Sequence, residues 1–241
     1  MLDNSAATEP AVIYRLYPYS DYSAVASAVT FEHGKIKIFI KNAYNKRGSP
    51  ICLIPGALSF SPKNSGLYRF HSFSHNPDYY HYIKNPDIAL RLNLCFDFFD
   101  QLFIHGESSA AFWKLILKFT DKNYRELSMY IIYRLLKDAG FWFYHPCACG
   151  KLEGGLTLHN GRIICERCNL TVSRGFAINQ EAARCLPLFE KTEAYRTAKF
   201  TSAEEGEVLK LFGAHLDSVL EKEEAVKSLK VFSNMLTTLQ Q

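Results

Sequence analysis

The first 75 residues alternate between short apolar runs and polar turns, a pattern that predicts strands. The clearest run is residues 35–41, where Ile36, Ile38 and Ile40 alternate with other positions. A period of two over seven residues predicts a strand with one buried face and one face in water. Similar runs lie at residues 11–16, 22–31, 51–60 and 67–73. Five short antiparallel strands without helical periodicity predict a small closed barrel of the OB type.

From residue 85 onward, apolar residues recur at the spacing of helices. Asn85 followed by Pro86 predicts an N-cap and a first helical position. Apolar positions continue at helical spacing until Gly106. Further helices are predicted at residues 109–119, 123–139, 179–191, 202–220 and 224–236, with Gly140 ending the second of these. The segment Ser202-Ala203-Glu204-Glu205 has the pattern of a capping box.

These patterns predict an α+β protein with an N-terminal OB-fold barrel in residues 1–80 and a helical domain in residues 81–241. Residues 76–84 are tyrosine-rich and polar and are expected to form a short connector. An insert at about residues 145–172 interrupts the helices. The polar N-terminus lacks the features of a signal peptide, and no run approaches the roughly 18 apolar residues of a membrane span. No membrane association is therefore expected.

The insert contains four cysteines in two tight pairs, a C-x-C and a C-x-x-C with 15 residues between them. The four are Cys147, Cys149, Cys165 and Cys168. Between the pairs, Asn160-Gly161 is flanked by apolar runs, the strongest short signal for a hairpin. Such a hairpin brings Cys165 back beside Cys149. Four thiolates this close predict one tetrahedral zinc ion with no open coordination position, which is a structural and not a catalytic site.

Other interpretations of this cluster stay open. In one alternative the cysteines are reduced thiols without a metal. In the other, His145 or His159 replaces one thiolate, because the first cysteine pair is one residue shorter than usual. A redox motif at residues 165–168 is disfavoured, since the surrounding pattern is not βαβ. The remaining cysteines lie in apolar or helical settings that predict buried thiols in a reducing compartment: Cys52, Cys95 and Cys185.

The net charge of +4 is modest, but its distribution is uneven. From His33 to Pro77 the chain has seven Lys or Arg residues and no Asp or Glu, which predicts a polyanion-binding region. On the strand at residues 35–41, lysines share one face with an aromatic ring, as in surfaces that contact phosphates and stack bases. The predicted DNA-binding residues are Lys35, Lys37, Phe39, Lys41, Lys46, Arg47 and Arg69. The alternative is an ordinary solvated strand whose lysines protect against edge aggregation.

Several other residues carry weaker signals. The aromatic residues of the last predicted strand are more typical of a barrel core than of a stacking surface: Tyr68, Phe70 and Phe73. Arg162 and Arg167 fit solvent-exposed positions better than phosphate contacts. Asp97 and Asp100 resemble nuclease carboxylates, but no third acid or positioned lysine accompanies them. Nucleotide-binding, hydrolase and zinc-protease motifs are missing from the sequence, so no enzymatic activity is predicted.

Several segments, taken in their order along the chain, resemble a known family. They are Tyr17–Asp21, Thr30–Lys35 and Lys41–Ala43 near the N-terminus, Leu135–Phe141, Cys147–Gly150 and Cys165–Cys168 in the middle, and Val226–Phe232 at the end. Together they resemble the bacterial DNA-repair mediator RecO over nearly the whole chain. The family commonly has Gly-Glu at Ser20-Asp21, Lys-Gly-Ala at residues 41–43, and a C-x-x-C as its first cysteine pair. The last departure leaves the metal ligand set open.

This resemblance implies a non-enzymatic recombination mediator. RecO-like proteins bind single- and double-stranded DNA, anneal complementary strands, and act with RecR to load RecA onto DNA coated by single-strand-binding protein (SSB). The resemblance also implies a contact between the helical domain and the SSB C-terminal tail, an indirect link to RecA, and a cytoplasmic, nucleoid-associated location. A zinc-ribbon protein associated with RNA or transcription is the alternative function.

Overall fold

A computed structural model describes residues 6–44, 49–62, 66–107, 110–142, 147–150, 155–159, 162–168, 176–191, 193, 196–222 and 225–238. The chain divides into two compact units: Met1–Phe96 with Phe103–Asp121, and Asp97–Leu102 with Lys122–Gln241. The barrel therefore shares its unit with helices that follow it in sequence. The predicted domain boundary between residues 80 and 81 stays a prediction.

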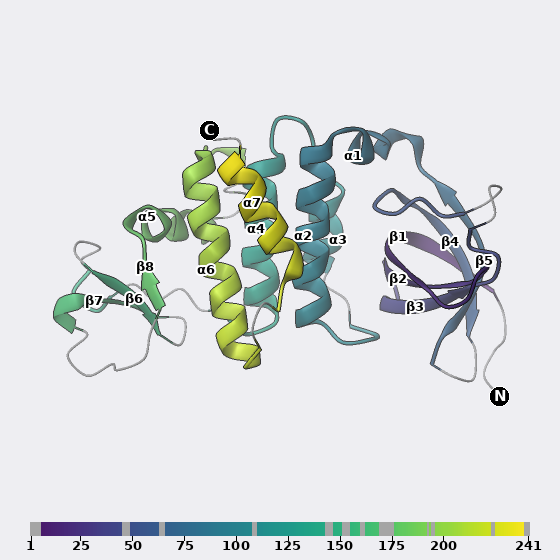
Figure 1. The fold of residues 1–241 in the computed structure, drawn as a ribbon, viewed down its shortest axis with the longest axis horizontal. Coiled ribbons are helices and arrows are strands. Elements are labelled where there is room, and N and C mark those ends of the chain that lie inside the picture. The colour runs from purple at the N-terminus through teal and green to yellow at the C-terminus, as the bar shows by residue number, and fades with distance from the viewer. Residues whose placement is uncertain are drawn as a thin grey trace. The chain divides into compact units, whose positions relative to one another are not determined.

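The first unit contains a closed, OB-like barrel of five strands in the order β1-β2-β3-β5-β4 (Figure 1). The strands are β1 (Ala7–Pro18), β2 (Ala24–Thr30), β3 (Gly34–Ile40), β4 (Pro55–Pro62) and β5 (Tyr68–His75). The predicted alternation of β3 is confirmed, because Ile36, Ile38 and Ile40 are buried in the barrel core. An α+β fold with an N-terminal barrel is thus present.

One pair of neighbouring strands departs from the expected antiparallel arrangement. Strands β3 and β5 run parallel, with Phe39 opposite Arg69, whereas the other neighbours are antiparallel. The expectation of an all-antiparallel barrel was wrong for a geometric reason. A closed ring with an odd number of strands cannot alternate direction all the way round, so one adjacent pair must be parallel.

The narrow barrel interior is filled by small and branched residues. Ala24, Ala26 and Ala28 of β2 are fully buried and leave room for the isoleucines of β3. Three aromatic residues of β5 pack against this core and are partly buried, which confirms their interpretation as core residues: Tyr68, Phe70 and Phe73.

The edge of β3 is shared between β5 and the loop that follows helix α2 (Pro86–Leu102). Strand β5 pairs with Ile38 and Phe39, at the end of β3. Near the start of β3, Lys35 donates its backbone N–H to the Glu107 carbonyl (2.8 Å) and accepts from Gly106 (2.8 Å). Gly106 has a φ of +85°, which favours glycine. The loop therefore completes the barrel wall where β5 does not reach.

Three helices complete the first unit or begin in it: α1 (His81–Lys84), α2 (Pro86–Leu102) and α3 (Ala110–Ile116). The predicted cap of α2 is confirmed, because the Asn85 Oδ1 accepts the Asp87 N–H at 3.0 Å. Helix α1 lies within the segment expected to be a connector. A bulge in β1 at Tyr14 directs this ring onto Phe96 of α2, where the two rings stack at 4.5 Å.

The second unit is built on α4 (Tyr124–Asp138), α5 (Gln180–Phe189), α6 (Ser202–Leu220) and α7 (Lys227–Thr238). Its core is aromatic: Tyr133 stacks on Phe189 at 5.6 Å, and Trp142 meets Phe212 edge-on at 5.4 Å. Gly140 follows α4 with a φ of +76°, as predicted. Among the described residues, no helix is both long and apolar enough to cross a membrane.

Helix α6 begins with a capping box one residue earlier than predicted. Thr201 accepts the Glu204 N–H (3.2 Å), and the Glu204 carboxylate accepts the Thr201 N–H (2.7 Å). The prediction placed Glu205 in this role, but Glu205 is fully buried and pairs with Arg125 of α4 at 3.1 Å. The tertiary ion pair thus decides which glutamate caps the helix.

The insert between α4 and α5 forms a small antiparallel sheet in the order β7-β6-β8. Its strands are β6 (Leu156–His159), β7 (Arg162–Cys165) and β8 (Phe176–Ile178). The predicted hairpin is confirmed by the pairing of Leu156 with Cys165 and of His159 with Arg162. Residues 160–161, predicted as its turn, lie outside the described residues. We refer to this sheet, together with residues 147–150 and 166–168, as the ribbon.

Candidate metal centre and candidate nucleic-acid interface

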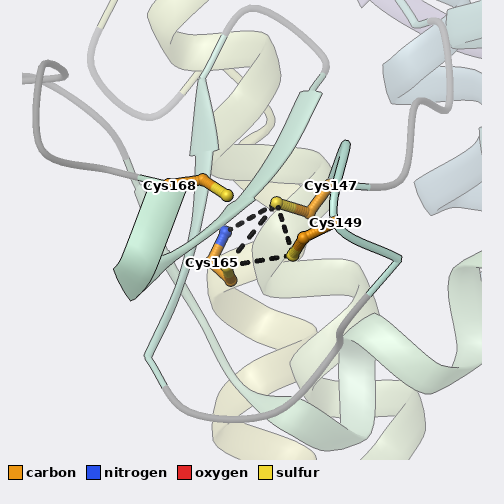
Figure 2. Close-up of side chains that lie close together, drawn as sticks. All are labelled: Cys147, Cys149, Cys165 and Cys168. Carbon is orange, nitrogen blue, oxygen red and sulfur yellow. Dashed lines mark hydrogen bonds between the residues drawn. The ribbon is translucent and has the colours of Figure 1, made fainter.

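The ribbon brings four thiols from two stretches of chain to one point (Figure 2). Cys147 and Cys149 lie in a turn that closes when the Gly150 N–H donates to the Cys147 carbonyl (2.8 Å). Gly150 has a φ of +70°, which this tight turn requires. Cys165 is the last residue of β7, and Cys168 ends the single helical turn that follows.

The distances between the sulfur atoms fit one tetrahedral metal ion. The Sγ atoms of Cys147, Cys149 and Cys165 are 3.4–3.6 Å apart, and all four sulfurs lie within 4.8 Å of one another. A disulfide bond is only about 2.05 Å long, so these are thiols. With Zn–S bonds of about 2.3 Å, two ligands of a tetrahedral zinc lie about 3.8 Å apart. The cluster is therefore compatible with a metal site.

Hydrogen bonds among these cysteines shift the pKa values of two of the thiols. The Cys165 backbone N–H donates to the Cys147 Sγ (3.4 Å), and this bond, together with hydrogen bonds from Cys149 and Cys168, lowers the pKa of Cys147 to about 6. The hydrogen bond with Cys147 raises the pKa of Cys168 to about 12. The Cys147 thiol thus ionises readily, while the Cys168 thiol keeps its proton. A bound cation removes the remaining protons, because only the thiolates are ligands.

The two histidines considered as replacement ligands fall outside this cluster. His159 pairs with Arg162 at the far end of the hairpin from Cys165. Three steps along a strand separate it from the cysteine end by about 10 Å. Among the described residues, the ligand group at this point consists of the four cysteines. His145 lies outside the described residues.

The remaining cysteines are not members of this cluster and form no disulfides. Cys95 and Cys185 are buried, as expected, whereas Cys52 is half-buried. Burial raises the pKa of Cys52 and of Cys185 to about 11, and raises the pKa of Cys95 further. These thiols are therefore protonated at neutral pH and are poor metal ligands or nucleophiles.

A second candidate site lies on the outside of the barrel. Tyr17, Val25, Phe39 and Arg69 are register neighbours in four adjacent strands, so their side chains follow one row. Lys41 is exposed at the end of β3. Sequence reasoning found three members of this group, Phe39, Lys41 and Arg69, on strands β3 and β5. The structure brings them together, and it adds Tyr17, which is 43% exposed.

A second row of cations runs beside the first. Lys37 is exposed and pairs with Ser27 of β2, which in turn pairs with Arg15 of β1. Lys37 and Arg15 therefore lie in one row. The Arg15 guanidinium donates to the Tyr17 hydroxyl at 3.3 Å, which links the two rows. Sequence reasoning missed Arg15 and Tyr17 because a β-bulge at residue 14 shifts the register of β1. We call the two rows with Lys41 the outer barrel face.

Lys35 does not lie on the open part of this face. It points outward from β3 like Lys37, but it is half-buried and its ammonium donates to the Phe103 carbonyl at 2.9 Å. The loop after α2 covers this end of the strand. The predicted contact of Lys35 with DNA stays a prediction, but its ammonium already has a partner within the protein. Lys46 and Arg47, also predicted to bind DNA, lie outside the described residues.

The acidic pair on α2 has a structural explanation. Asp97 is buried, and its carboxylate accepts the Ser228 N–H in the first turn of α7 at 3.2 Å. A carboxylate in this position accepts a hydrogen bond from an N–H that has no partner within the helix. Its negative charge also interacts favourably with the positive end of the helix dipole. Among the described residues, the clusters with metal-ligating geometry do not include Asp97 or Asp100. Asp97 therefore has a structural role at the start of α7.

Comparisons with known proteins leave the family open. No protein-family model matches the chain, and no curated protein matches its sequence. The resemblance to RecO therefore stays a prediction. The function is argued below from the two sites.

Proposed function

We propose that this protein is a non-enzymatic recombination mediator that binds and anneals single-stranded DNA and helps to load RecA onto SSB-coated DNA. The observation that carries this proposal is the outer barrel face. There, cations from three strands flank the Phe39 ring: Arg15, Lys37, Lys41 and Arg69. The acid-free stretch from His33 to Pro77 supplies most of this surface.

The geometry suits the backbone of a nucleic-acid strand. Alternate residues of a strand are about 6–7 Å apart, which is close to the spacing of successive phosphates. Neutralising phosphates releases counterions, so affinity should fall steeply with salt and depend little on sequence. The same neutralisation lowers the repulsion between two complementary strands held by the protein, which favours annealing without ATP.

In this proposal the ribbon binds one structural zinc ion through Cys147, Cys149, Cys165 and Cys168. Bound zinc holds the turn at residues 147–150 against the end of β7. Four protein ligands leave no position for water or substrate, which fits a role in structure. Thiolate ligands also favour a reducing compartment, so we place the protein in the cytoplasm and at the nucleoid.

The resemblance to RecO supplies the proposed partners. They are single- and double-stranded DNA, RecR, the SSB C-terminal tail and, indirectly, RecA. The helical second unit is the proposed contact for the SSB tail.

An annealing assay tests the proposed function. Complementary strands coated with SSB are mixed with the protein, without ATP, at two ionic strengths. We expect faster annealing, and we expect the triple variant Lys37→Glu, Lys41→Glu, Arg69→Glu to lose it. A matched variant, Lys84→Glu, Lys222→Glu, Lys227→Glu, makes the same change in net charge at exposed positions elsewhere and should anneal normally. Equal activity of the two variants contradicts the proposal.

The alternative function, an RNA- or transcription-associated ribbon protein, is favoured by exposed Arg167 next to the metal ligand Cys168. That function predicts RNA binding at least as tight as DNA binding, no annealing, and loss of RNA affinity in Arg167→Glu. The same assay therefore separates the two functions.

A further inference from the structure

A hollow opens in the outer barrel face where β3 and β5 separate. The two strands pair at Ile38–Tyr68 and at Phe39–Arg69, the last pair in their parallel register. Beyond this pair a cavity of about 410 Å³ is lined by Phe39, Lys41, Arg69 and Phe70. It lies entirely within the first unit. Its position follows from the register, because diverging strands leave a gap that their side chains only partly fill.

The lining of the hollow combines two kinds of side chain. Phe39 and Phe70 supply aromatic surface, while Lys41 and Arg69 supply positive charge. Both cations are exposed. An aromatic floor with flanking cations is complementary to a ligand that has a flat apolar ring and an attached anion. A nucleotide is such a ligand, and the volume lies in the range of about 300–1,000 Å³ typical of small-molecule pockets.

A third ring stands next to this hollow. Tyr19 meets Phe39 edge-on, with ring centroids 5.4 Å apart and planes at 88°. Its own surface is 69% exposed. The loop that carries it is held in place, because the Tyr19 N–H donates to the Ser23 carbonyl at 2.9 Å. The perpendicular rings of Tyr19 and Phe39 form a corner. Its shape suits a flat base that is stacked on one ring and edge-on to the other.

We propose that this hollow binds a single unpaired nucleotide of a DNA strand. The base stacks in the corner of Phe39 and Tyr19, and Lys41 and Arg69 hold the adjoining phosphates. Tyr19 then becomes a specificity-determining residue that selects single strands, since the bases of a duplex are stacked inside it and cannot enter without being extruded. This inference rests on the proposed DNA-binding function and specifies which form of DNA the face prefers.

Fluorescence anisotropy with the full-length protein and four probes tests the inference. The probes are an oligothymidine strand, an abasic strand of the same length, a duplex, and thymidine 5′-monophosphate as competitor. We expect Tyr19→Ala and Phe39→Leu each to weaken oligothymidine binding about tenfold, the usual effect of losing one stacked ring. Binding of the abasic strand and of the duplex should change less than twofold. Tyr19→Phe keeps the ring and should bind like the wild type.

Two controls distinguish folding from binding. Phe176→Ala removes an exposed ring from the ribbon and should leave all affinities unchanged. Circular dichroism melting of Tyr19→Ala should match the wild type, because Tyr19 is mostly exposed and contributes little to the core. A Tyr19→Ala variant that melts normally but binds oligothymidine as well as the wild type overturns the inference.

The remaining outcomes separate this inference from the proposed function. If Lys37→Glu weakens every DNA probe while Tyr19→Ala weakens all probes equally or none, the outer face binds DNA but the hollow does not take a base. If Lys37→Glu changes no probe, the proposed function itself fails. Displacement of the strand by thymidine monophosphate at an equal concentration overturns the assignment to a strand and indicates a mononucleotide site.

Discussion

The barrel and the ribbon are both small β-structures, but they are stabilised in different ways. The barrel is closed around a core cluster of eleven buried residues that come from four strands and the turn after β3. The ribbon buries four aliphatic side chains among its described residues: Leu156, Leu158, Ile163 and Ile178. Small units that bury so little apolar surface usually need an additional crosslink to be stable. The cysteine cluster is in the right place to provide one.

We therefore expect the two sites to have different roles. The barrel has its own closed apolar core and exposes cations and rings on its outer face. In the proposed function the ribbon binds a metal ion, and metal binding and local folding are then one process. We therefore expect changes at one site to leave the other largely unaffected.

The largest expected effect is the loss of metal. Cys165→Ser removes a buried ligand, and structural zinc binding is worth about 10 kcal/mol or more at neutral pH. We expect the metal content, measured by atomic emission, to fall from about one ion per chain to none, with a lower melting temperature. DNA affinity should stay within twofold. Cys52→Ser, at a half-buried thiol outside the cluster, is the control and should keep its metal.

An unchanged metal content and melting temperature in Cys165→Ser would falsify the structural-metal proposal. A large loss of DNA affinity would instead show that the ribbon and the barrel are coupled.

The reverse experiment weakens the barrel. Ile38 is fully buried in the barrel core, and Ile38→Ala should cost about 2–5 kcal/mol through lost burial and a cavity. We expect a lower urea midpoint when unfolding is monitored by the loss of DNA binding. The metal content of the folded protein should stay unchanged. Metal loss in Ile38→Ala under native conditions contradicts the expected independence of the barrel and the ribbon.

The smallest effects come from two matched glycines. Gly150 in the cysteine turn (φ +70°) and Gly66 before β5 (φ +72°) have the same backbone conformation, and an added Cβ meets no atom within 4 Å at either site. Alanine therefore introduces only backbone strain, of about 1 kcal/mol. Gly150→Ala should weaken metal affinity several-fold in a competition with a chromophoric chelator. Gly66→Ala should leave metal affinity unchanged and lower only the stability of the barrel unit.

Equal metal affinities in the two variants indicate that the cysteine turn is not formed in the metal-bound state. This pair of variants is the most sensitive comparison of the two regions, because the chemical change and the strain are the same.

The sequence predicted those features that depend on neighbours along the chain. The alternation of Ile36, Ile38 and Ile40, the cap at Asn85 and the hairpin between β6 and β7 all follow from local spacing. The cysteine pairs were recognisable for the same reason, since the hairpin between them dictates their approach. Each of these features is confirmed because no distant contact competes with the local preference.

Features that depend on distant contacts were not predictable. At the bulge in β1 the Tyr14 ring stacks on Phe96 of α2, and the register after this bulge aligns Tyr17 with Phe39. The loop after α2 occupies Lys35, which looked available from its strand pattern alone. Both outcomes depend on which surfaces meet after folding, and a strand pattern does not contain that information.

Periodicity along the chain was thus sufficient for the strands, the helices and the thiol cluster, since these depend mainly on residues close in sequence, whereas closure of the barrel pairs β1 with the distant β4. The composition of the outer barrel face, including Arg15, Tyr17 and Tyr19, depended on strand register and on closure with one parallel pair. Register is set by packing across the whole barrel, and a shift of one residue turns every side chain to the opposite face. Tertiary packing therefore determined which residues share a surface.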